Sequence, residues 1–219
     1  TMTPTTPLQH YFVANELVRH GVRFASLAPR FCGEFQKGID YIGDVEQFSC
    51  ELAVHDAIAK KFGYKVSVHS GSDKFMVFPA VGRLTGGVFH VKTAGTNWLE
   101  AVRLVAIKDP AFYRELHAFA LNSFAEATTY YHVTTDLGRI PDINTLSDEQ
   151  LPDLMKHNDA RQLLHITYGL ILTAKDEAGN RYLRDRLYAL LNTYADDYAA
   201  LLEGHIGRHL ALLLGDTQA

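Results

Sequence analysis

Two short β-branched runs, each followed by a small polar cluster and then a helical pattern, constrain the fold of this chain most strongly. The runs cover residues 65–69 and 88–92, and the clusters that follow them are SGSDK (70–74) and TAGTN (93–97). Strand, polar loop and helix in repeated order is typical of βα-built proteins, whose binding and catalytic residues lie where strands end. The pattern therefore predicts an α/β fold with a candidate site at these two strand ends.

The side chains of His69, His90 and Lys92 lie in these runs. Alternate residues of a strand share a face, so His69 lies beside Ser67, and Lys92 lies beside His90. A strand buried on both faces is normally apolar, and burying these groups costs free energy unless each finds a partner. A single strand His is commonly a hydrogen-bonded core residue, and Gly-rich polar clusters are commonly plain helix caps. Two neighbouring strand ends with both features favour a functional site instead, and helix amides at such turns suit phosphate or carboxylate groups.

The composition narrows the class of protein. A length of 219 residues allows one sizeable core, and we expect residues 1–219 to form a single domain. The net charge of −4 and the scattered basic residues argue against nucleic acid as a partner. Cys32 and Cys50 are the only cysteines and form no CxxC, which favours a reducing, cytoplasmic location. No apolar run approaches the roughly 20 residues that span a bilayer, and the first residues lack the features of a signal peptide, so we expect no membrane partner.

Helical periodicity and β-branched runs predict the remaining elements. We expect further strands at 22–28 and 128–134, and helices at 10–20, 45–62, 74–81, 98–108, 111–127, 157–173 and 180–214, the last broken around Gly204 and Gly207. The loop 29–44 between the first strand and the second helix is long and charged, with Arg30 and Glu34 near its start. Loops of this length in a compact domain tend to be functional.

The helix predicted at 157–173 carries Arg161 and His165 four residues apart, and therefore on one face. The interpretation that we favour is an amphipathic helix with an exposed polar face. The alternative is that Arg161 or His165 faces a cleft and binds an anion.

The four predicted strands, each followed by helix, suggest a barrel of the (β/α)₈ TIM type. A closed barrel needs eight strands and about 250 residues. We therefore expect the C-terminal half of such a barrel, about four βα units, plus extra C-terminal helices. Three explanations for the missing strands stay open. The chain is a fragment of a longer protein, it pairs with another half-barrel, or it forms an open α/β layer.

Four segments carry a resemblance to a known family. The strings SLAPRFCGEFQKGIDYIGD, VSVHSGSDKF, FHVKTAGTNWLEA and RQLLHITYGLIL resemble the C-terminal portion of the tagaturonate/fructuronate epimerase family. The resemblance covers nearly the whole chain, but family members are roughly twice as long on a full-barrel count. It implies a metal-dependent isomerase with a barrel fold that interconverts D-tagaturonate and D-fructuronate by inversion at C4.

Under this resemblance, the strand ends and the long loop supply the candidate site. His69 and His90 are the candidate ligands of a divalent metal, with zinc, manganese and nickel all suitable. Glu34, Asp73 and Lys92 are the candidate acid and base groups. The candidate substrate-binding residues are Arg30, Lys74, Thr96, Asn97 and Arg161. The sequence does not decide between direct proton transfer and retro-aldol cleavage.

The expected partners are a small sugar acid and either a second copy of the chain or a missing N-terminal half. Two other functions stay open. The first is a non-catalytic fragment or module that self-associates, because open sheet edges invite pairing. The second is another metal-dependent sugar or sugar-phosphate isomerase or aldolase, because a barrel scaffold does not fix the reaction.

Overall fold

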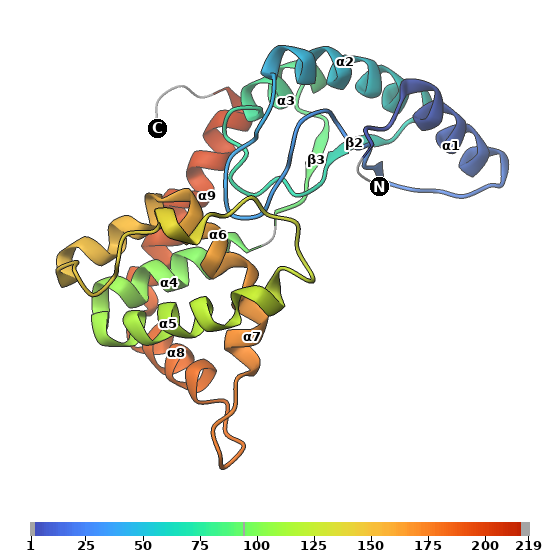
Figure 1. Cartoon of the computed structure of the whole chain (residues 1–219). Helices are drawn as coiled ribbons and strands as arrows, with labels where there is room; N and C mark the ends of the chain where they lie inside the picture. Colours follow the sequence, from blue (N-terminus) through green and yellow to red (C-terminus); the bar gives the residue numbers. More distant parts are fainter. Residues whose placement is uncertain (1–2, 94, 216–219) are drawn as a thin grey trace. The chain divides into compact units, whose positions relative to one another are not determined.

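The computed structural model describes residues 3–93 and 95–215, which form two compact units (Figure 1). We call them the sheet unit, with described residues 3–35, 40–93 and 207–215, and the helical unit, with residues 36–39 and 95–206. The chain is a mixed α/β protein that is mostly helical. Each unit has a hydrophobic core of its own.

The sheet unit is built around three short parallel strands in the order β1-β2-β3. Ser26 pairs with Lys65 at the start of β2, and Ser67 pairs with His90 in β3. The elements of this unit are α1 (Pro7–Arg19), β1 (Ser26–Leu27), α2 (Val45–Phe62), β2 (Lys65–Val68), α3 (Phe78–Thr85) and β3 (Phe89–Val91), with the end of α9 (Ala195–Leu214). Both strand runs that the sequence singled out are therefore strands.

One face of the sheet is packed and the other is polar. Val66 and Val68 are fully buried in the core that also contains Phe48 and Leu52 of α2. Alternation along β2 then places Ser67 and His69 on the opposite face. The hydrophobic set on one face fixes the register, because a shift of one residue would exchange the two faces.

Helix α2 begins and ends at the residues that the sequence predicted. Asp44 is its N-cap, and its Oδ1 accepts hydrogen bonds from the backbone N–H groups of Glu46 (2.8 Å) and Gln47 (3.1 Å). Gly63 ends the helix in the left-handed conformation, with φ of 74°. The cap and the glycine stop satisfy backbone groups that the helix itself leaves without partners.

We expect Asp44→Ala to lower the free energy of unfolding by about 1 kcal/mol, because two backbone donors lose their acceptor. Urea denaturation of the variant against wild type measures this loss. Asp44→Asn is the matched control, since its side-chain oxygen still caps the helix, and it should lose much less. Equal losses for the two variants would show that the cap contributes little.

The helical unit packs around α4 and α5, which lie side by side in Figure 1. Its core includes Trp98, Leu99, Phe112, Leu116 and Leu163, all buried. The elements of this unit are α4 (Thr96–Lys108), α5 (Pro110–Ala127), the 3₁₀ segments η1 (Leu137–Arg139) and η2 (Asp148–Lys156), α6 (Asn158–Ile166), α7 (Tyr168–Thr173), α8 (Tyr182–Thr193) and the first part of α9.

The predicted strand at 128–134 is wrong. Residues 128–130 form a turn after α5, and residues 131–136 have no regular structure. The hydroxyl groups of Thr128 and Thr129 donate to the carbonyls of Ala125 and Glu126, so they extend the end of the helix. Farther on, the Thr134 amide donates to the side chain of Gln36 rather than to another strand. The residue types are typical of a strand, but these hydrogen bonds hold the backbone in a turn followed by an irregular segment.

Three helix predictions also need correction. The helix expected at 74–81 lies at Phe78–Thr85, where a proline occupies its first turn, a position that tolerates the missing N–H. The tail breaks at Tyr194, between α8 and α9, and Gly204 and Gly207 lie inside α9. The segment 157–173 is two helices separated at Thr167, whose hydroxyl donates back to the Leu163 carbonyl (2.7 Å). No helix within the described ranges 3–93 and 95–215 has the length and apolarity needed to cross a membrane.

Candidate functional site

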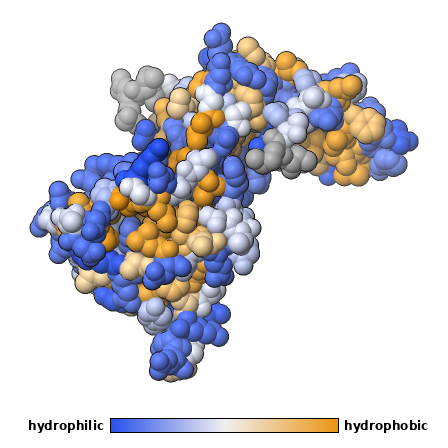
Figure 2. Space-filling view, viewed as in Figure 1, coloured by the Kyte–Doolittle hydropathy of each residue, from blue (hydrophilic) through white to orange (hydrophobic). Residues whose placement is uncertain are grey.

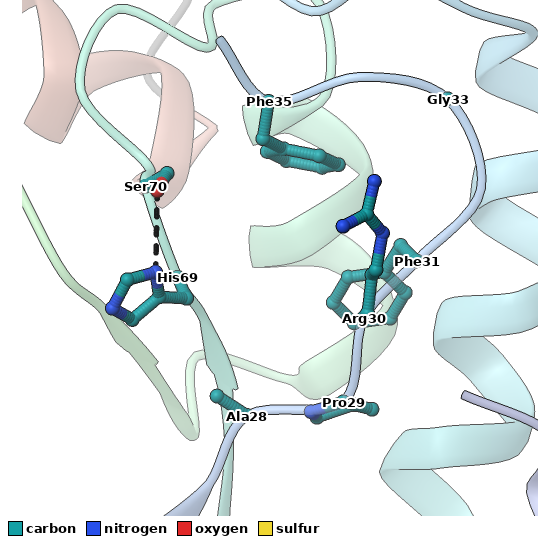
Figure 3. Close-up of a pocket in the computed structure, with 8 residues that line it drawn as sticks. All are labelled: Ala28, Pro29, Arg30, Phe31, Gly33, Phe35, His69 and Ser70. Atoms are coloured by element: carbon teal, nitrogen blue, oxygen red, sulfur yellow. Dashed lines mark hydrogen bonds between the residues drawn. The ribbon is translucent and has the colours of Figure 1, made fainter. Parts of the chain in front are cut away.

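A pocket of about 380 Å³ opens in the sheet unit beside the end of β2 (Figure 3). Arg30 from the long loop and His69 from the strand end stand on opposite walls, and the Nδ1 of His69 is 3.2 Å from the Ser70 hydroxyl. The lining residues are Ala28, Pro29, Arg30, Phe31, Gly33, Phe35, His69 and Ser70. A guanidinium, an imidazole and two aromatic rings around one cavity suit a small polar molecule that carries an anionic group.

The polar face of the sheet bears both predicted metal ligands. His69 and His90 are exposed, and the Nδ1 of His90 lies 2.7 Å from the Oγ of buried Ser67. Because His90 pairs with Ser67, it is a diagonal neighbour of His69 on the same face, with Cα atoms roughly 8 Å apart by strand geometry. That His69 and His90 bind one metal ion stays a prediction.

The loop after β2 contains two residues in a backbone conformation that favours glycine. Ser70 has φ of 56° and Asp73 has φ of 59°. Such non-glycine residues cost about 1–3 kcal/mol each and persist where the surroundings impose them, often at functional sites. Asp73 is buried, and the fully buried Lys74 donates from Nζ to the Ser72 carbonyl at 2.9 Å. The loop is therefore a fixed structure that contains a carboxylate and an ammonium group.

Asp73 lies against a histidine that the sequence interpretation overlooked. The Asp73 backbone N–H donates to the Nε2 of His209 (3.1 Å), and the Asp73 carboxylate lies 3.6 Å from the same nitrogen. The rings of Phe75 and Phe78 flank the imidazole of His209, and both partners are buried. His205 precedes His209 by four residues on α9, which places the two imidazoles on one helix face. This HxxxH spacing is typical of metal-binding helices and was visible in the sequence.

Glu34 and Lys92 are both half-buried residues of the sheet unit. Glu34 forms a backbone bridge with Ile42 across the long loop, and it lies between the lining residues Gly33 and Phe35. Lys92 follows β3, and its carbonyl accepts from the Gly71 amide at 2.8 Å. Both remain predicted acid or base groups, and Lys92 lies on a segment bonded to the loop after β2.

Thr96 and Asn97 belong to the helical unit, where they form the first turn of α4. No side chain caps this helix, and its N-cap Gly95 has φ of 84°. A Cβ atom at Gly95 would overlap the ring of His165, so only glycine fits there. Thr96 is buried and its hydroxyl has no hydrogen-bond partner within the described ranges, whereas Asn97 is exposed. Their predicted role in substrate binding stays a prediction.

Arg161 lies in the helical unit and contacts backbone carbonyls. Its Nε donates to the Gly38 carbonyl (2.7 Å), and its Nη1 donates to the Met155 carbonyl (2.8 Å). Gln162 donates to Gln36 (2.8 Å), so α6 holds the segment 36–39 through two neighbouring side chains. The expectation that the polar face of this helix is exposed is wrong, because Arg161, Gln162 and His165 are all buried. These polar residues form an interior network that fixes the loop.

Comparison with known proteins identifies the relatives of this chain. A family model described as tagaturonate epimerase matches residues 1–213. A tagaturonate/fructuronate epimerase from Thermotoga maritima is 47% identical over 216 residues, which are 98% of this chain and 44% of that protein.

Solved structures give the same result. Crystal structures of fructuronate-tagaturonate epimerase from Cohnella laeviribosi, native and with bound glycerol, are 60% identical to this chain with a TM-score of 0.95. The match covers 97% of this chain and 44% of each crystallised chain. The present chain thus spans less than half the length of the relatives that it matches.

Proposed function

The chain belongs to the tagaturonate epimerase family, and from this premise we propose that it forms part of an enzyme that interconverts D-tagaturonate and D-fructuronate by inversion at C4. The observation that carries the proposal is the polar sheet face in the sheet unit, where His69 and His90 are exposed next to the pocket of Arg30. Such a face exposes groups that a catalytic cavity would use. The additional residues of the longer relatives would enclose this cavity.

In this proposal the sheet is a portion of a (β/α)₈ barrel. Three parallel strands that neighbour each other in chain order, with helices after them, are the arrangement that a barrel repeats. The remaining strands would come from the additional length that the relatives have. The polar face would then line the interior at the carboxyl ends of the strands, where barrel enzymes bind substrate.

The substrate carboxylate is assigned to Arg30. A guanidinium binds a carboxylate through two parallel N–H donors, and Figure 3 shows the Arg30 side chain extending along the pocket wall. Thr96 and Asn97 of the helical unit stay predicted substrate-binding residues. The buried contacts of Lys74 and Arg161 with backbone carbonyls support a positioning role for these two residues more directly.

The residues of the polar face fit a divalent metal ion. His69 and His90 each have a serine hydroxyl beside Nδ1, the kind of contact that orients an imidazole ligand. Asp73 and His209 are a second candidate pair, with a carboxylate oxygen and a ring nitrogen 3.6 Å apart. When bound, such an ion would polarise the hydroxyl and carbonyl oxygens of the sugar acid.

Proton movement is assigned to Glu34, Asp73 and Lys92. Direct epimerisation requires one group to remove the proton from C4 and another to return one on the opposite face. Retro-aldol cleavage instead requires a base to take the proton of the C4 hydroxyl and an acid to return it after the C–C bond re-forms on the other face of the aldehyde. Glu34 lies beside the pocket residues, and Asp73 and Lys92 lie at the ends of the adjacent strand loops. Two carboxylates and an ammonium group provide both a base and an acid.

The test is uronate turnover by the full-length protein and by this chain alone. We expect the full-length protein to convert D-tagaturonate into D-fructuronate, to lose activity with a chelator and to regain it with a divalent ion. This chain alone should convert little, because its polar face is open to water. Faster turnover of sugar phosphates than of uronates by the full-length protein would assign another reaction to the site, and absence of uronate turnover would reject the proposal.

An exposed apolar face on α1 favours association with more protein. Leu8 and Phe12 are 77% and 63% exposed, and Figure 2 shows apolar surface in the region of α1. The spacing of four residues places them on one face of the helix. We propose that residues of the full-length protein that this chain lacks cover this face, and that a second copy covers it when this chain is alone. We also propose that the enzyme is cytoplasmic. Light-scattering mass measurements of the chain and of the full-length protein distinguish these occupants.

A further inference from the structure

The end of α9 places His209 against the loop that follows β2, inside the sheet unit. His209 and Leu213 are both buried and lie four residues apart, so they share one face of the helix. This end of the helix packs closely on α3, where a Cβ atom at Gly82 would overlap the Leu213 carbonyl. The imidazole of His209 lies against the rings of Phe75 and Phe78, at 4.8 and 5.4 Å between ring centroids. These contacts restrict the orientation of the imidazole.

A hydrogen bond with a backbone amide determines where the hydrogen of this ring lies. The Asp73 N–H donates to the Nε2 of His209 at 3.1 Å, and both residues are buried. Each nitrogen of a neutral imidazole has either a hydrogen or a lone pair, so an Nε2 that accepts carries no hydrogen. The hydrogen of the ring is then on Nδ1. His209 is therefore a neutral acceptor while this bond is formed.

The same bond argues against a metal ion on the Nε2 of His209. A metal ion needs the lone pair of its nitrogen ligand, and the Asp73 amide already occupies this lone pair. The Asp73 carboxylate lies 3.6 Å from Nε2, which is beyond hydrogen-bond distance. The contact between Asp73 and Nε2 is thus made by the amide, and His69 and His90 are left as the candidate metal ligands.

The amide that His209 binds belongs to a residue with an unfavourable backbone conformation. Asp73 has φ of 59°, in the left-handed region that favours glycine. A non-glycine residue persists there where its surroundings impose the conformation. The bond to His209 is such a constraint, because it holds the amide of the strained residue itself. The neighbouring Lys74 is fully buried and donates to the Ser72 carbonyl, so the loop is also held beside Asp73.

We propose that His209 is a positioning residue, which holds the backbone of Asp73 and thereby orients the Asp73 carboxylate for proton transfer. The side chain of Asp73 leaves the backbone at the Cα next to the amide that His209 binds, so a rotation of this amide turns the carboxylate with it. Proton transfer by Asp73 rests on the function proposed above, whereas the hydrogen bond and its effect on the loop do not. His209 itself touches no reacting atom.

The orientation of a proton-transferring group has a large effect on rate. A base must lie within hydrogen-bond distance of the proton that it takes, about 2.6–3.2 Å between heavy atoms. A misplacement of roughly 1 Å can lower the rate about 100-fold. The substrate carboxylate is assigned to Arg30, so loss of the His209 acceptor should lower kcat much more than it raises KM.

Two measurements on this chain test the hydrogen bond without substrate. Imidazole ¹⁵N NMR at about pH 7.5 should show the hydrogen of His209 on Nδ1 and none on Nε2. In amide hydrogen exchange, His209→Phe should lower the protection of the Asp73 amide about tenfold, because phenylalanine fills the site without an acceptor. His209→Gln should keep the protection, because its side-chain oxygen reaches roughly the position of Nε2. A hydrogen on Nε2 in the wild type would overturn the proposal.

Kinetics of the full-length protein test the effect on the reaction. His209→Phe should lower kcat for uronate epimerisation about 100-fold and change KM less than about threefold, whereas His209→Gln should keep kcat within about tenfold of the wild type. Metal content should be the same in both variants and in the wild type. Equal kcat values in the two variants would show that the acceptor is not needed, and loss of metal from both would assign His209 as a ligand. Either result overturns the proposal.

The two sets of measurements separate failure of this proposal from failure of the proposed reaction. If the wild-type protein does not convert uronates, the reaction is rejected, and the spectra and amide exchange still decide whether His209 holds Asp73. If His209→Phe does not fold, the wild-type spectrum and the kcat of His209→Gln decide.

Discussion

Replacing His69 with alanine in the full-length protein is expected to lower kcat/KM for uronate epimerisation by about 100-fold or more. His69 ends β2, is exposed on the polar face and lines the pocket opposite Arg30. If it binds a metal ion or exchanges a proton, alanine leaves no group that replaces it. Because His69 is exposed, the free energy of unfolding should change less than for a buried side chain.

The measurement pairs steady-state kinetics with metal content by mass spectrometry. Reduced activity with reduced metal content assigns His69 as a ligand, and reduced activity with unchanged metal content assigns it to substrate or proton transfer. His20→Ala is the matched control, since His20 is an exposed histidine of the same unit and far along the sequence from the strand ends. Activity of His69→Ala equal to that of the control would remove His69 from the site.

Arg161→Met is expected to lower the free energy of unfolding by about 3 kcal/mol. Arg161 is 8% exposed, its guanidinium donates to the carbonyls of Gly38 and Met155, and methionine fills a similar volume without donors. Both buried carbonyls would then lack these partners. The helical unit would lose one of the two contacts that fix the segment 36–39 on α6, and the contacts of Gln162 would remain.

Guanidinium denaturation measures the loss, with Arg139→Met as control. Arg139 belongs to the same unit but forms an exposed ion pair with Asp136, so its replacement should change stability by less than about 1 kcal/mol. A direct role of Arg161 in substrate binding predicts a different result. In that case the full-length variant would keep its stability and show a raised KM for the uronate.

The elements that the sequence predicted well are those in which local pattern and packing agree. Helix α2 has an Asp cap, an apolar stripe and a glycine stop, and its bounds match the prediction at both ends. The strands β2 and β3 lie within the predicted runs because their valines and phenylalanine alternate with polar residues. The run at 128–134 has the same residue types, yet its hydroxyls bond the end of α5 and Gln36 takes the Thr134 amide. Composition alone does not show which partner a backbone group finds.

The candidate site was predictable where it follows from strand order. His69 and His90 share a face because β2 and β3 are parallel with Ser67 opposite His90. The contact of Asp73 with His209 was not predictable, because 136 residues separate them and periodicity carries no information about such a pair. For Arg161, the sequence predicted the helix on which it lies. It did not predict its hydrogen-bond partner, the Gly38 carbonyl, which is 123 residues away.

The loop after β2 has a consequence for attempts to make this family more heat-resistant. Glycine at position 70 would relieve the left-handed backbone of Ser70, so selection for thermal tolerance alone should favour this replacement. It would also free a segment whose rigidity keeps the neighbouring carboxylate and imidazole in fixed orientations. Variants with glycine at this position should therefore be more thermostable but have a lower kcat. A library screened only for thermal stability would select such variants without detecting the lost activity.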